Sequence, residues 1–196
     1  MHRLIKFRQK IHPLALCCAS ILAATACQSE PAPPAAAVTH VADKARRCGD
    51  QGFLSTSLFG SIERQLAWEA DEFDCDSMLR PDGEGMRVRF TGDAANRVVA
   101  IILAIPDLER GQDGSELPTV VTLTVEGSGR FFSTADLDAC FTDIQAQPDA
   151  GETKALYDAI GTMYCIEPLG EVNGDAAVSI PKLEFRTRIE WSGNDA

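Results

Sequence analysis

The chain has 196 residues, of which 45% are hydrophobic and 24% charged, and it carries 18 Lys and Arg against 29 Asp and Glu. Its formal net charge is −11 and its sequence pI is near 4.7. This composition is typical of a globular protein, and it excludes a disordered chain and a polytopic membrane protein. The acidic balance also argues against a nucleic-acid partner, because phosphate binding needs a basic face.

The first 26 residues differ in character from the rest of the chain. Residues 1–10 hold Arg3, Lys6, Arg8 and Lys10 with no acid, and residues 11–26 contain no charged side chain. A basic start followed by a short apolar run predicts an export signal peptide. The run is too short for a comfortable transmembrane helix, which needs about 20 apolar residues.

The apolar run ends in Ala23-Ala24-Thr25-Ala26-Cys27. This ending resembles the lipobox of bacterial lipoproteins, with Ala24 where Leu is usual. The resemblance implies a lipoprotein signal peptide over residues 1–26, cleavage before Cys27, and palmitate and other acyl chains on Cys27 as a membrane anchor. Gln28, in place of Asp, implies the outer membrane, with the domain facing the periplasm. The alternative is an ordinary secretory signal cut near Ala26, which leaves Cys27 as a free thiol.

Two further segments follow the signal peptide. Residues 27–42 are rich in Pro and Ala, which is typical of a tether between a membrane anchor and a domain. Residues 43–196 have the length of one domain. Removal of residues 1–26 would leave 170 residues and would discard four basic side chains and no acidic one, so the side-chain charge would become −15.

Four cysteines remain in the predicted domain, namely Cys48, Cys75, Cys140 and Cys165. In an exported domain they predict two disulfides. Three connectivities exist, and we favour Cys48–Cys75 with Cys140–Cys165 because both loops are then short. A zinc site made of the four cysteines is the alternative, but no C-x-x-C pair is present.

The domain contains no histidine, because the chain's three histidines are His2, His12 and His40. This removes Ser-His-Asp and Cys-His catalysis and His-ligated metals. No G-x-S-x-G, Walker or G-x-G-x-x-G motif occurs either. An enzyme here would depend on carboxylates, arginines and tyrosines, so we expect a non-catalytic protein.

Strand patterns dominate the domain. Residues 86–90 alternate, with Met86, Val88 and Phe90 on one face, and residues 97–105 form a continuous β-branched run. Further extended segments are expected at residues 117–125, 130–134, 156–166 and 176–191. The sequence therefore predicts a mainly β domain, an antiparallel β-sandwich or barrel of about eight to ten strands, with room for one short helix.

Residues 61–73 fit two periodicities. Ile62, Leu66, Ala70 and Phe73 have helical spacing, whereas Ile62, Leu66 and Trp68 also fit a strand. An internal echo, in which Phe185, Ile189 and Trp191 repeat the spacing of Ile62, Leu66 and Trp68, favours the strand.

An acidic cluster surrounds Cys75. In an extended chain Glu72, Asp74 and Asp76 share one face, and a hard cation such as Ca²⁺ would relieve their repulsion. The alternative is a solvated face whose carboxylates pair across strands with Arg87 and Arg89. The ordered spacing of a known calcium loop is missing.

Three other features suggest binding or chemistry. Trp68 and Trp191 are candidates for a glycan- or protein-binding surface, although core packing would also account for them. The Gly127-Ser128-Gly129-Arg130 turn offers backbone amides to an anion, and a hairpin loop is the alternative. Arg186 and Arg188 fit either an outer strand face or an anion site. Paired carboxylates could serve glycoside hydrolysis, but no pair stands out.

The sequence thus predicts a lipid-anchored envelope lipoprotein whose β domain is a non-catalytic binding or structural accessory. Its expected partners are the membrane, through the lipid, and an envelope protein or glycan. The alternatives are a calcium- or glycan-dependent binding module and a carboxylate-based hydrolase.

Overall fold

Antiparallel strands make up most of the domain, with almost no helix. The computed structural model describes residues 47–151 and 155–191, and all of them belong to one compact unit. These residues form 13 strands and one turn of 3-10 helix: β1 Phe53–Gly60, β2 Arg64–Glu69, β3 Phe73–Leu79, β4 Met86–Asp93, β5 Val98–Ile105, β6 Gly114–Pro118, β7 Val120–Val125, β8 Arg130–Ser133, η1 Leu137–Ala139, β9 Cys140–Ala146, β10 Leu156–Cys165, β11 Leu169–Glu171, β12 Ala177–Ser179 and β13 Leu183–Glu190.

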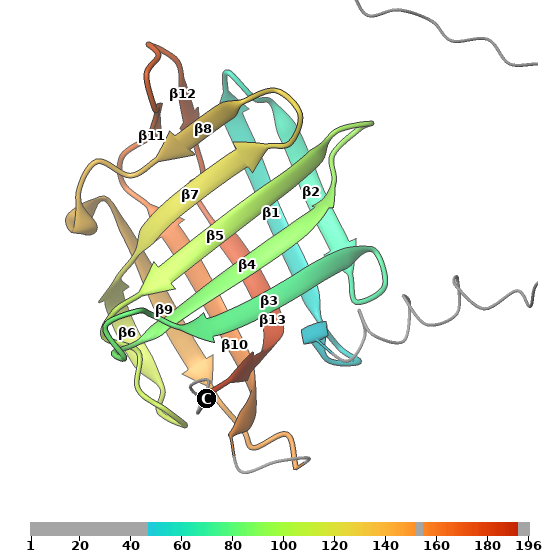
Figure 1. Cartoon of the computed structure of the whole chain (residues 1–196), viewed down its shortest axis with the longest axis vertical. Coiled ribbons are helices and arrows are strands. Elements are labelled where there is room, and N and C mark those ends of the chain that lie inside the picture. The colour runs from blue at the N-terminus through green and yellow to red at the C-terminus, as the bar shows by residue number, and fades with distance from the viewer. Residues whose placement is uncertain (1–46, 152–154, 192–196) are drawn as a thin grey trace, which may run out of the picture. The chain divides into compact units, whose positions relative to one another are not determined.

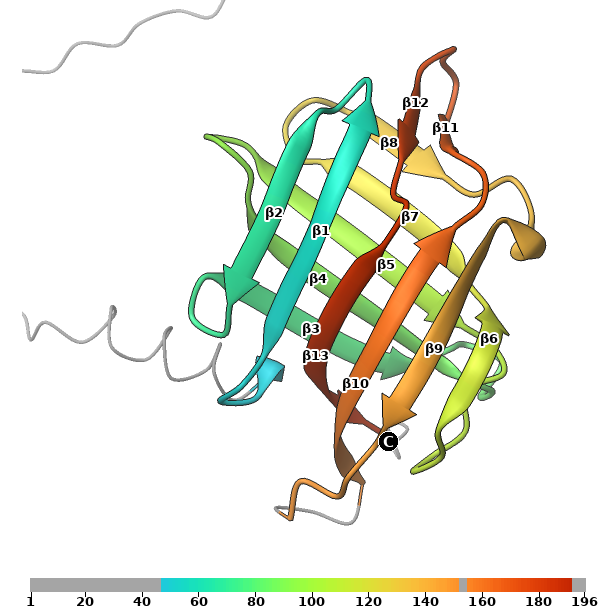
Figure 2. The same ribbon diagram turned by 180° about the vertical axis from the view of Figure 1, so that it is seen from behind.

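The strands form one hydrogen-bonded path that is folded into two layers. Its order is β3-β4-β5-β7-β8-β11-β12-β1-β13-β10-β9-β6, with β2 paired to the other edge of β1. Strands β3, β4, β5 and β7 lie in front in Figure 1, and the layer of β2, β1, β13, β10 and β9 comes forward in Figure 2. The predicted mainly β fold of sandwich or barrel type is confirmed, with more strands than expected because β6, β11 and β12 are very short.

Strand β1 connects the two layers. Its first half, Phe53 to Thr56, pairs with β13, whereas Phe59 and Gly60 pair with β12. The Thr56 hydroxyl donates a 2.7 Å hydrogen bond to the carbonyl of Lys182, where the chain passes between β12 and β13. The sequence pattern does not predict this strand.

The core follows the predicted alternation. Met86, Val88 and Phe90 of β4 are all buried, as expected. Phe90 packs between two other buried rings, Phe73 at 6.2 Å and Phe185 at 5.5 Å between centroids, and so joins β4 to β3 and to the opposite layer. Burial of such rings contributes roughly 2–3 kcal/mol each.

The ambiguous segment after β1 is a strand, as the echo favoured. Residues 64–69 form β2, in register with β1, so that Trp68 lies opposite Leu54 and Leu66 opposite Thr56. Leu66 and Trp68 are buried. Ile62 lies in the turn before the strand, so the echo covers only part of the segment.

Both predicted disulfides are present. Cys48 is bonded to Cys75, and Cys140 is bonded to Cys165. The first ties the start of the described domain to β3, and the second links the paired strands β9 and β10 at Cys140 opposite Cys165. Four bonded cysteines leave no thiolate for the alternative zinc site.

Candidate functional site

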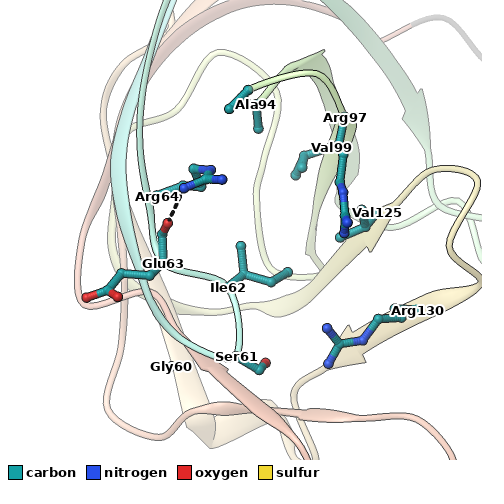
Figure 3. A pocket seen from close by; sticks show the side chains of 11 residues that line it. Gly60, Ser61, Ile62, Glu63, Arg64, Ala94, Arg97, Val99, Val125 and Arg130 are labelled. Carbon is teal, nitrogen blue, oxygen red and sulfur yellow. Dashed lines mark hydrogen bonds between the residues drawn. The ribbon is translucent and has the colours of Figure 1, made fainter.

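A hollow opens at one end of the sandwich, where three turns meet. Residues of the β1–β2 turn, the β4–β5 turn and the β7–β8 hairpin surround it (Figure 3), and its volume is about 510 Å³. Its floor includes Val99 and Val125, which lie opposite each other in β5 and β7. The lining residues are Gly60, Ser61, Ile62, Glu63, Arg64, Ala94, Ala95, Arg97, Val99, Val125 and Arg130.

Three arginines converge on this hollow from three different parts of the chain. Arg64 begins β2, Arg97 precedes β5 and Arg130 begins β8. Figure 3 shows their side chains arranged around the same space, with Ile62, Val99 and Val125 between them. The chain as a whole is acidic, so this gathering of positive charge runs against its overall balance.

Two of the three guanidinium groups have no carboxylate partner among the described residues. Arg64 donates from Nη1 to the carbonyl of Glu63 at 3.1 Å. Arg97 makes no hydrogen bond or ion pair with any side chain of residues 47–151 or 155–191. The Glu63 carboxylate points away from the hollow in Figure 3. The hollow therefore keeps a positive rim.

Arg130 is held in place by two contacts. Its Nε donates to Oε1 of Glu171 at 2.6 Å, and its guanidinium lies 4.9 Å from the centroid of the Phe132 ring. The hydrogen bond and the charge of Glu171 raise the pKa of Arg130, and the hydrogen bond from Arg130 lowers the pKa of Glu171. Both groups are thus ionised, and Arg130 has a fixed direction at the edge of the hollow.

The glycine turn beside Arg130 is a hairpin loop, and its amides are used locally. The amide of Ser128 donates to the carbonyl of Val125 at 3.2 Å. The amide of Arg130 donates to the Ser128 hydroxyl at 3.2 Å. The turn therefore does not cradle an anion with these amides, but it does place the Arg130 side chain at the hollow.

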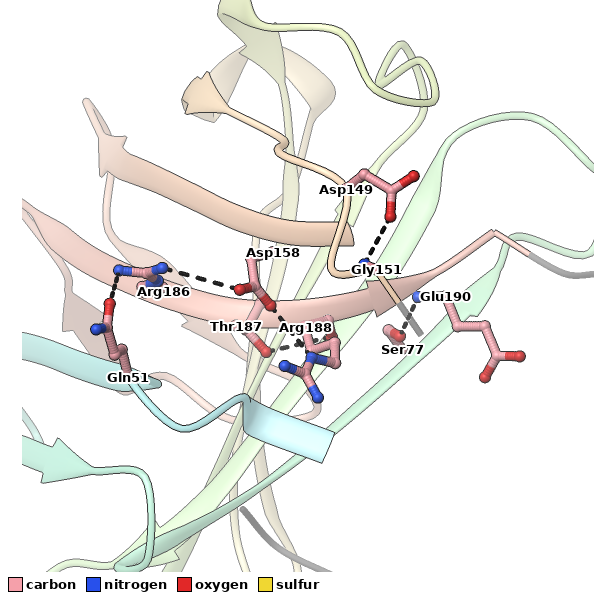
Figure 4. A network of polar contacts seen from close by, with 9 residues as sticks. All are labelled: Gln51, Ser77, Asp149, Gly151, Asp158, Arg186, Thr187, Arg188 and Glu190. Atoms are coloured by element: carbon pink, nitrogen blue, oxygen red, sulfur yellow. Dashed lines mark hydrogen bonds and ion pairs between the residues drawn. The ribbon is translucent and has the colours of Figure 1, made fainter. Parts of the chain in front are cut away.

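Arg186 and Arg188 lie on the outer face of β13 and pair with a carboxylate. Arg188 Nε lies 3.2 Å from Oδ1 of Asp158 on β10, and Arg186 Nη2 lies 3.8 Å from Oδ2 of the same residue. Gln51, which precedes β1, accepts a further hydrogen bond from Arg186. Figure 4 shows this network. The outer-face interpretation is confirmed, and the Asp158 carboxylate contacts both guanidinium groups, which does not favour the anion-site alternative.

The two tryptophans both pack against the core. Trp68 is buried; its ring stacks on Phe73 at 5.9 Å and its Nε1 donates to the carbonyl of Asp93 at 2.9 Å. Trp191 is half-buried, packs against the core and donates from Nε1 to Oε1 of Gln147 at 3.1 Å. Both indoles therefore contribute to packing, as the core-packing alternative expects, and a binding role for them stays a prediction.

The three carboxylates predicted to bind Ca²⁺ are not brought together. Glu72 lies in the β2–β3 turn, where its Oε2 accepts from the amide of Glu69 at 2.9 Å. Asp74 pairs with Arg47 at 3.3 Å, and Asp76 lies opposite Arg89 in the β3–β4 register. Arg89 in turn pairs with Glu126 at 3.1 Å. Among residues 47–151 and 155–191 no three His, Cys, Asp or Glu side chains could hold a metal ion together.

The anchoring segments lie outside the part of the chain that the structure describes. Cys27, the signal peptide over residues 1–26 and the tether over residues 27–42 are all among residues 1–46. Within the described residues, no helix has both the length and the apolar character to span a membrane.

Comparisons with protein-family models, with curated proteins and with solved structures found no match to this chain. The arginine-rimmed hollow is therefore the principal indication of function. Sequence reasoning singled out Arg130 but not Arg64 or Arg97, and no local pattern marks these two as partners, because only the fold brings the three turns together.

Proposed function

We propose that the domain is the binding module of a lipid-anchored envelope protein, and that it binds an anionic group in the hollow rimmed by Arg64, Arg97 and Arg130. The observation that carries this proposal is the convergence of three guanidinium groups in an acidic chain. Positive charges that lie near one another without partners repel. Their convergence in an acidic chain therefore favours a role in binding an anion.

The chemistry of the rim favours carboxylate or phosphate. Guanidinium groups bind both with paired, parallel hydrogen bonds, and they do so more tightly when part of the site is dry. The floor contributes Ile62, Val99 and Val125, so the ligand would present its charge to the rim and an apolar portion to the floor. A volume of about 510 Å³ lies within the range of small-ligand sites.

The position of the hollow fits an anchored protein. The described chain begins beside the Cys48–Cys75 disulfide, and Figure 1 shows this start and the β1–β2 turn at opposite ends of the sandwich. With a lipid on Cys27 and the tether between, the chain from the anchor would enter the domain at the end that holds this disulfide. The outer-membrane, periplasm-facing location and the envelope partner or glycan remain part of the proposal.

Anion titration tests the binding function. We would titrate the purified protein with citrate and, separately, with inorganic pyrophosphate by calorimetry at low ionic strength, where exposed charges are screened least. A double variant, Arg64→Gln with Arg97→Gln, removes two charges from the rim. Arg87→Gln is the matched control, because Arg87 lies on the outer face of β4, away from the hollow.

We expect the native protein and the Arg87→Gln control to bind at least one of the two anions with equal affinity. The double variant should bind it at least about tenfold more weakly, a loss of about 1.4 kcal/mol. Equal binding by all three proteins, or no binding by the native protein, would refute the proposal.

A further inference from the structure

Strand β2 has an open edge next to the hollow. Among the described strands it pairs with β1 alone. The amide of Glu69 donates to Glu72 Oε2, and its carbonyl accepts from the amide of Glu72, so the backbone of Glu69 points away from β1. Because backbone groups alternate in direction along a strand, those of Gln65 and Ala67 also point to the open edge.

A groove runs along this edge. It has a volume of about 590 Å³ and lies between β2 and the β4–β5 turn. Trp68 lines it and is tied across to the carbonyl of Asp93. The groove and the hollow have Arg64, Ala94 and Ala95 in common, so the two spaces adjoin at the start of β2. One elongated occupant can therefore reach both.

The combined site has opposite charges at its two ends. Arg64, Arg97 and Arg130 rim the hollow at the start of β2, whereas Asp71, Glu72 and Asp93 line the groove toward the end of the strand. An occupant that pairs antiparallel with β2 runs toward Arg64, so its carboxyl end enters the hollow. A peptide's terminal carboxylate is the anion that this direction delivers.

We propose that the ligand is an extended peptide segment with a free carboxyl terminus, added to β2 as an antiparallel strand. This rests on the proposed anion-binding function and names the source of the anion. The terminal carboxylate lies among the three arginines, and basic side chains about four to six residues upstream lie beside Asp71, Glu72 and Asp93. The outward backbone groups of Glu69 are already bonded to Glu72, so the peptide pairs with Gln65 and Ala67. The six residues of β2 span about 20 Å at ~3.3 Å per residue, a length that one short peptide covers.

Strand addition suits this edge because backbone hydrogen bonds supply affinity while side-chain charges select the sequence. A lone phosphate or lipid headgroup would use the hollow and leave the edge of β2 unpaired. A second copy of this chain would use the edge and leave the hollow empty. The peptide uses both features.

The probe is a heptapeptide that begins with two lysines and continues with alternating threonine and valine to a free carboxyl terminus. Binding is followed by calorimetry and by the fluorescence of the native protein, since Trp68 lines the groove. Four altered peptides are compared: a carboxyl-terminal amide, a version with two glutamates in place of the lysines, and two N-methylated versions, one methylated at the odd positions and one at the even positions.

We expect the free acid to bind at least about tenfold more tightly than the amide and several-fold more tightly than the acidic version. One of the two N-methylated peptides should lose binding while the other keeps it, because only one set of amides faces β2. Citrate should compete with the free acid. This comparison leaves the protein unchanged, so its folding does not enter the result.

Failure of this inference is separable from failure of the proposed function. If citrate or pyrophosphate binds but the free acid and the amide bind equally, or if both N-methylated peptides bind like the parent, the strand-addition proposal is overturned and the anion site stands. If the protein dimerises and dimerisation blocks the probe, the edge belongs to a second copy and the proposal is also overturned. If neither anion binds, both proposals fail.

Discussion

Arg130 and Glu171 are joined by a 2.6 Å hydrogen bond from Nε to Oε1, and their strands β8 and β11 pair directly beside it, at Phe132 opposite Glu171. This contact fixes one side of the hollow, because Arg130 has its direction set by a residue 41 positions away. The positive rim and the stability of this end of the sandwich therefore depend on the same carboxylate.

Glu171→Gln should change how the free energy of unfolding depends on pH in the acid range. The pKa of Glu171 is lowered below its ordinary value of 4.5 by the hydrogen bond from Arg130, so the folded state favours the ionised form. This contribution is full above the unfolded-state pKa and is lost as the pH falls through the folded one. Urea denaturation between pH 7 and pH 2 should show native and variant proteins converging below about pH 4. If the difference in the free energy of unfolding between the two proteins stayed constant from pH 7 to pH 2, ionisation of Glu171 would not be its cause.

Tyr164→Phe should instead change how the free energy of unfolding depends on pH in the alkaline range. Burial, followed by the charges of Glu116 and Asp143, raises the pKa of Tyr164 above its ordinary value of 10.0, and its ring packs on Phe141 at 5.7 Å. The unfolded chain therefore loses the phenol proton first, so stability falls as the pH rises through 10 and toward the folded pKa. The variant should lose less stability between pH 9 and pH 11. If plots of the free energy of unfolding against pH ran parallel for the two proteins, Tyr164 would not have a raised pKa in the folded state.

The position of Trp68 shows how far the sequence predicts this fold. Alternation correctly placed Leu66 and Trp68 on one face of a strand, and cysteine spacing correctly predicted both disulfides. Whether Trp68 points into the core depends on Gly92 of β4, since a Cβ there would lie 2.7 Å from the indole. That requirement joins residues in different strands, and no local pattern contains it.

Local sequence patterns predict neither the arginine rim nor strand β1, for related reasons. Arg64, Arg97 and Arg130 come together only when three turns meet at one end of the sandwich. The serines, threonine and glycine of β1 are common in loops as well as strands, and its strand partners β12 and β13 lie at the far end of the chain. The acidic cluster was visible in the sequence, but the pairing of Asp74 with Arg47 was not.

Gly92→Ala should be destabilising. The added methyl group would lie 2.7 Å from Cε2 of Trp68, so the ring or the strand must shift, which typically costs about 1–3 kcal/mol. Gly170→Ala is the matched control, because no atom lies within 4 Å of the Cβ it would add; its effect should stay within about 1 kcal/mol. Urea denaturation followed by tryptophan fluorescence measures both. Similar losses in the two variants would show that Trp68 is not the cause.

Removal of either disulfide should destabilise the domain by a similar amount. The two bonds close loops with separations of 27 and 25 residues, and the loop-entropy model gives each about 3 kcal/mol. The double variants Cys48→Ser with Cys75→Ser, and Cys140→Ser with Cys165→Ser, should show this loss in denaturation. Peptide mapping without reductant should recover these two links alone, and a crosswise link such as Cys48 with Cys140 would contradict the structure.

Cys27→Ala tests the anchor. The lipobox resemblance predicts that the native protein incorporates labelled palmitate and fractionates with the outer membrane, whereas the variant does neither. The substitution changes none of the residues that form the core or line the hollow among the described residues. A Cys27→Ala protein that stayed on the membrane and kept the label would refute the lipoprotein assignment. Anion binding by the released variant should be unchanged.

The pairing of β1 with β12 and β13 has a consequence for how the chain reaches its final state. Because synthesis begins at the amino terminus, β1 stays without two of its partner strands until the last strands have been made. Such distant pairings slow folding, and until then the edge of β1 that is not paired with β2 stays open to unwanted pairing. These pairings of β1 form only when β12 and β13 are present, so a chain truncated before β12 should remain prone to aggregation.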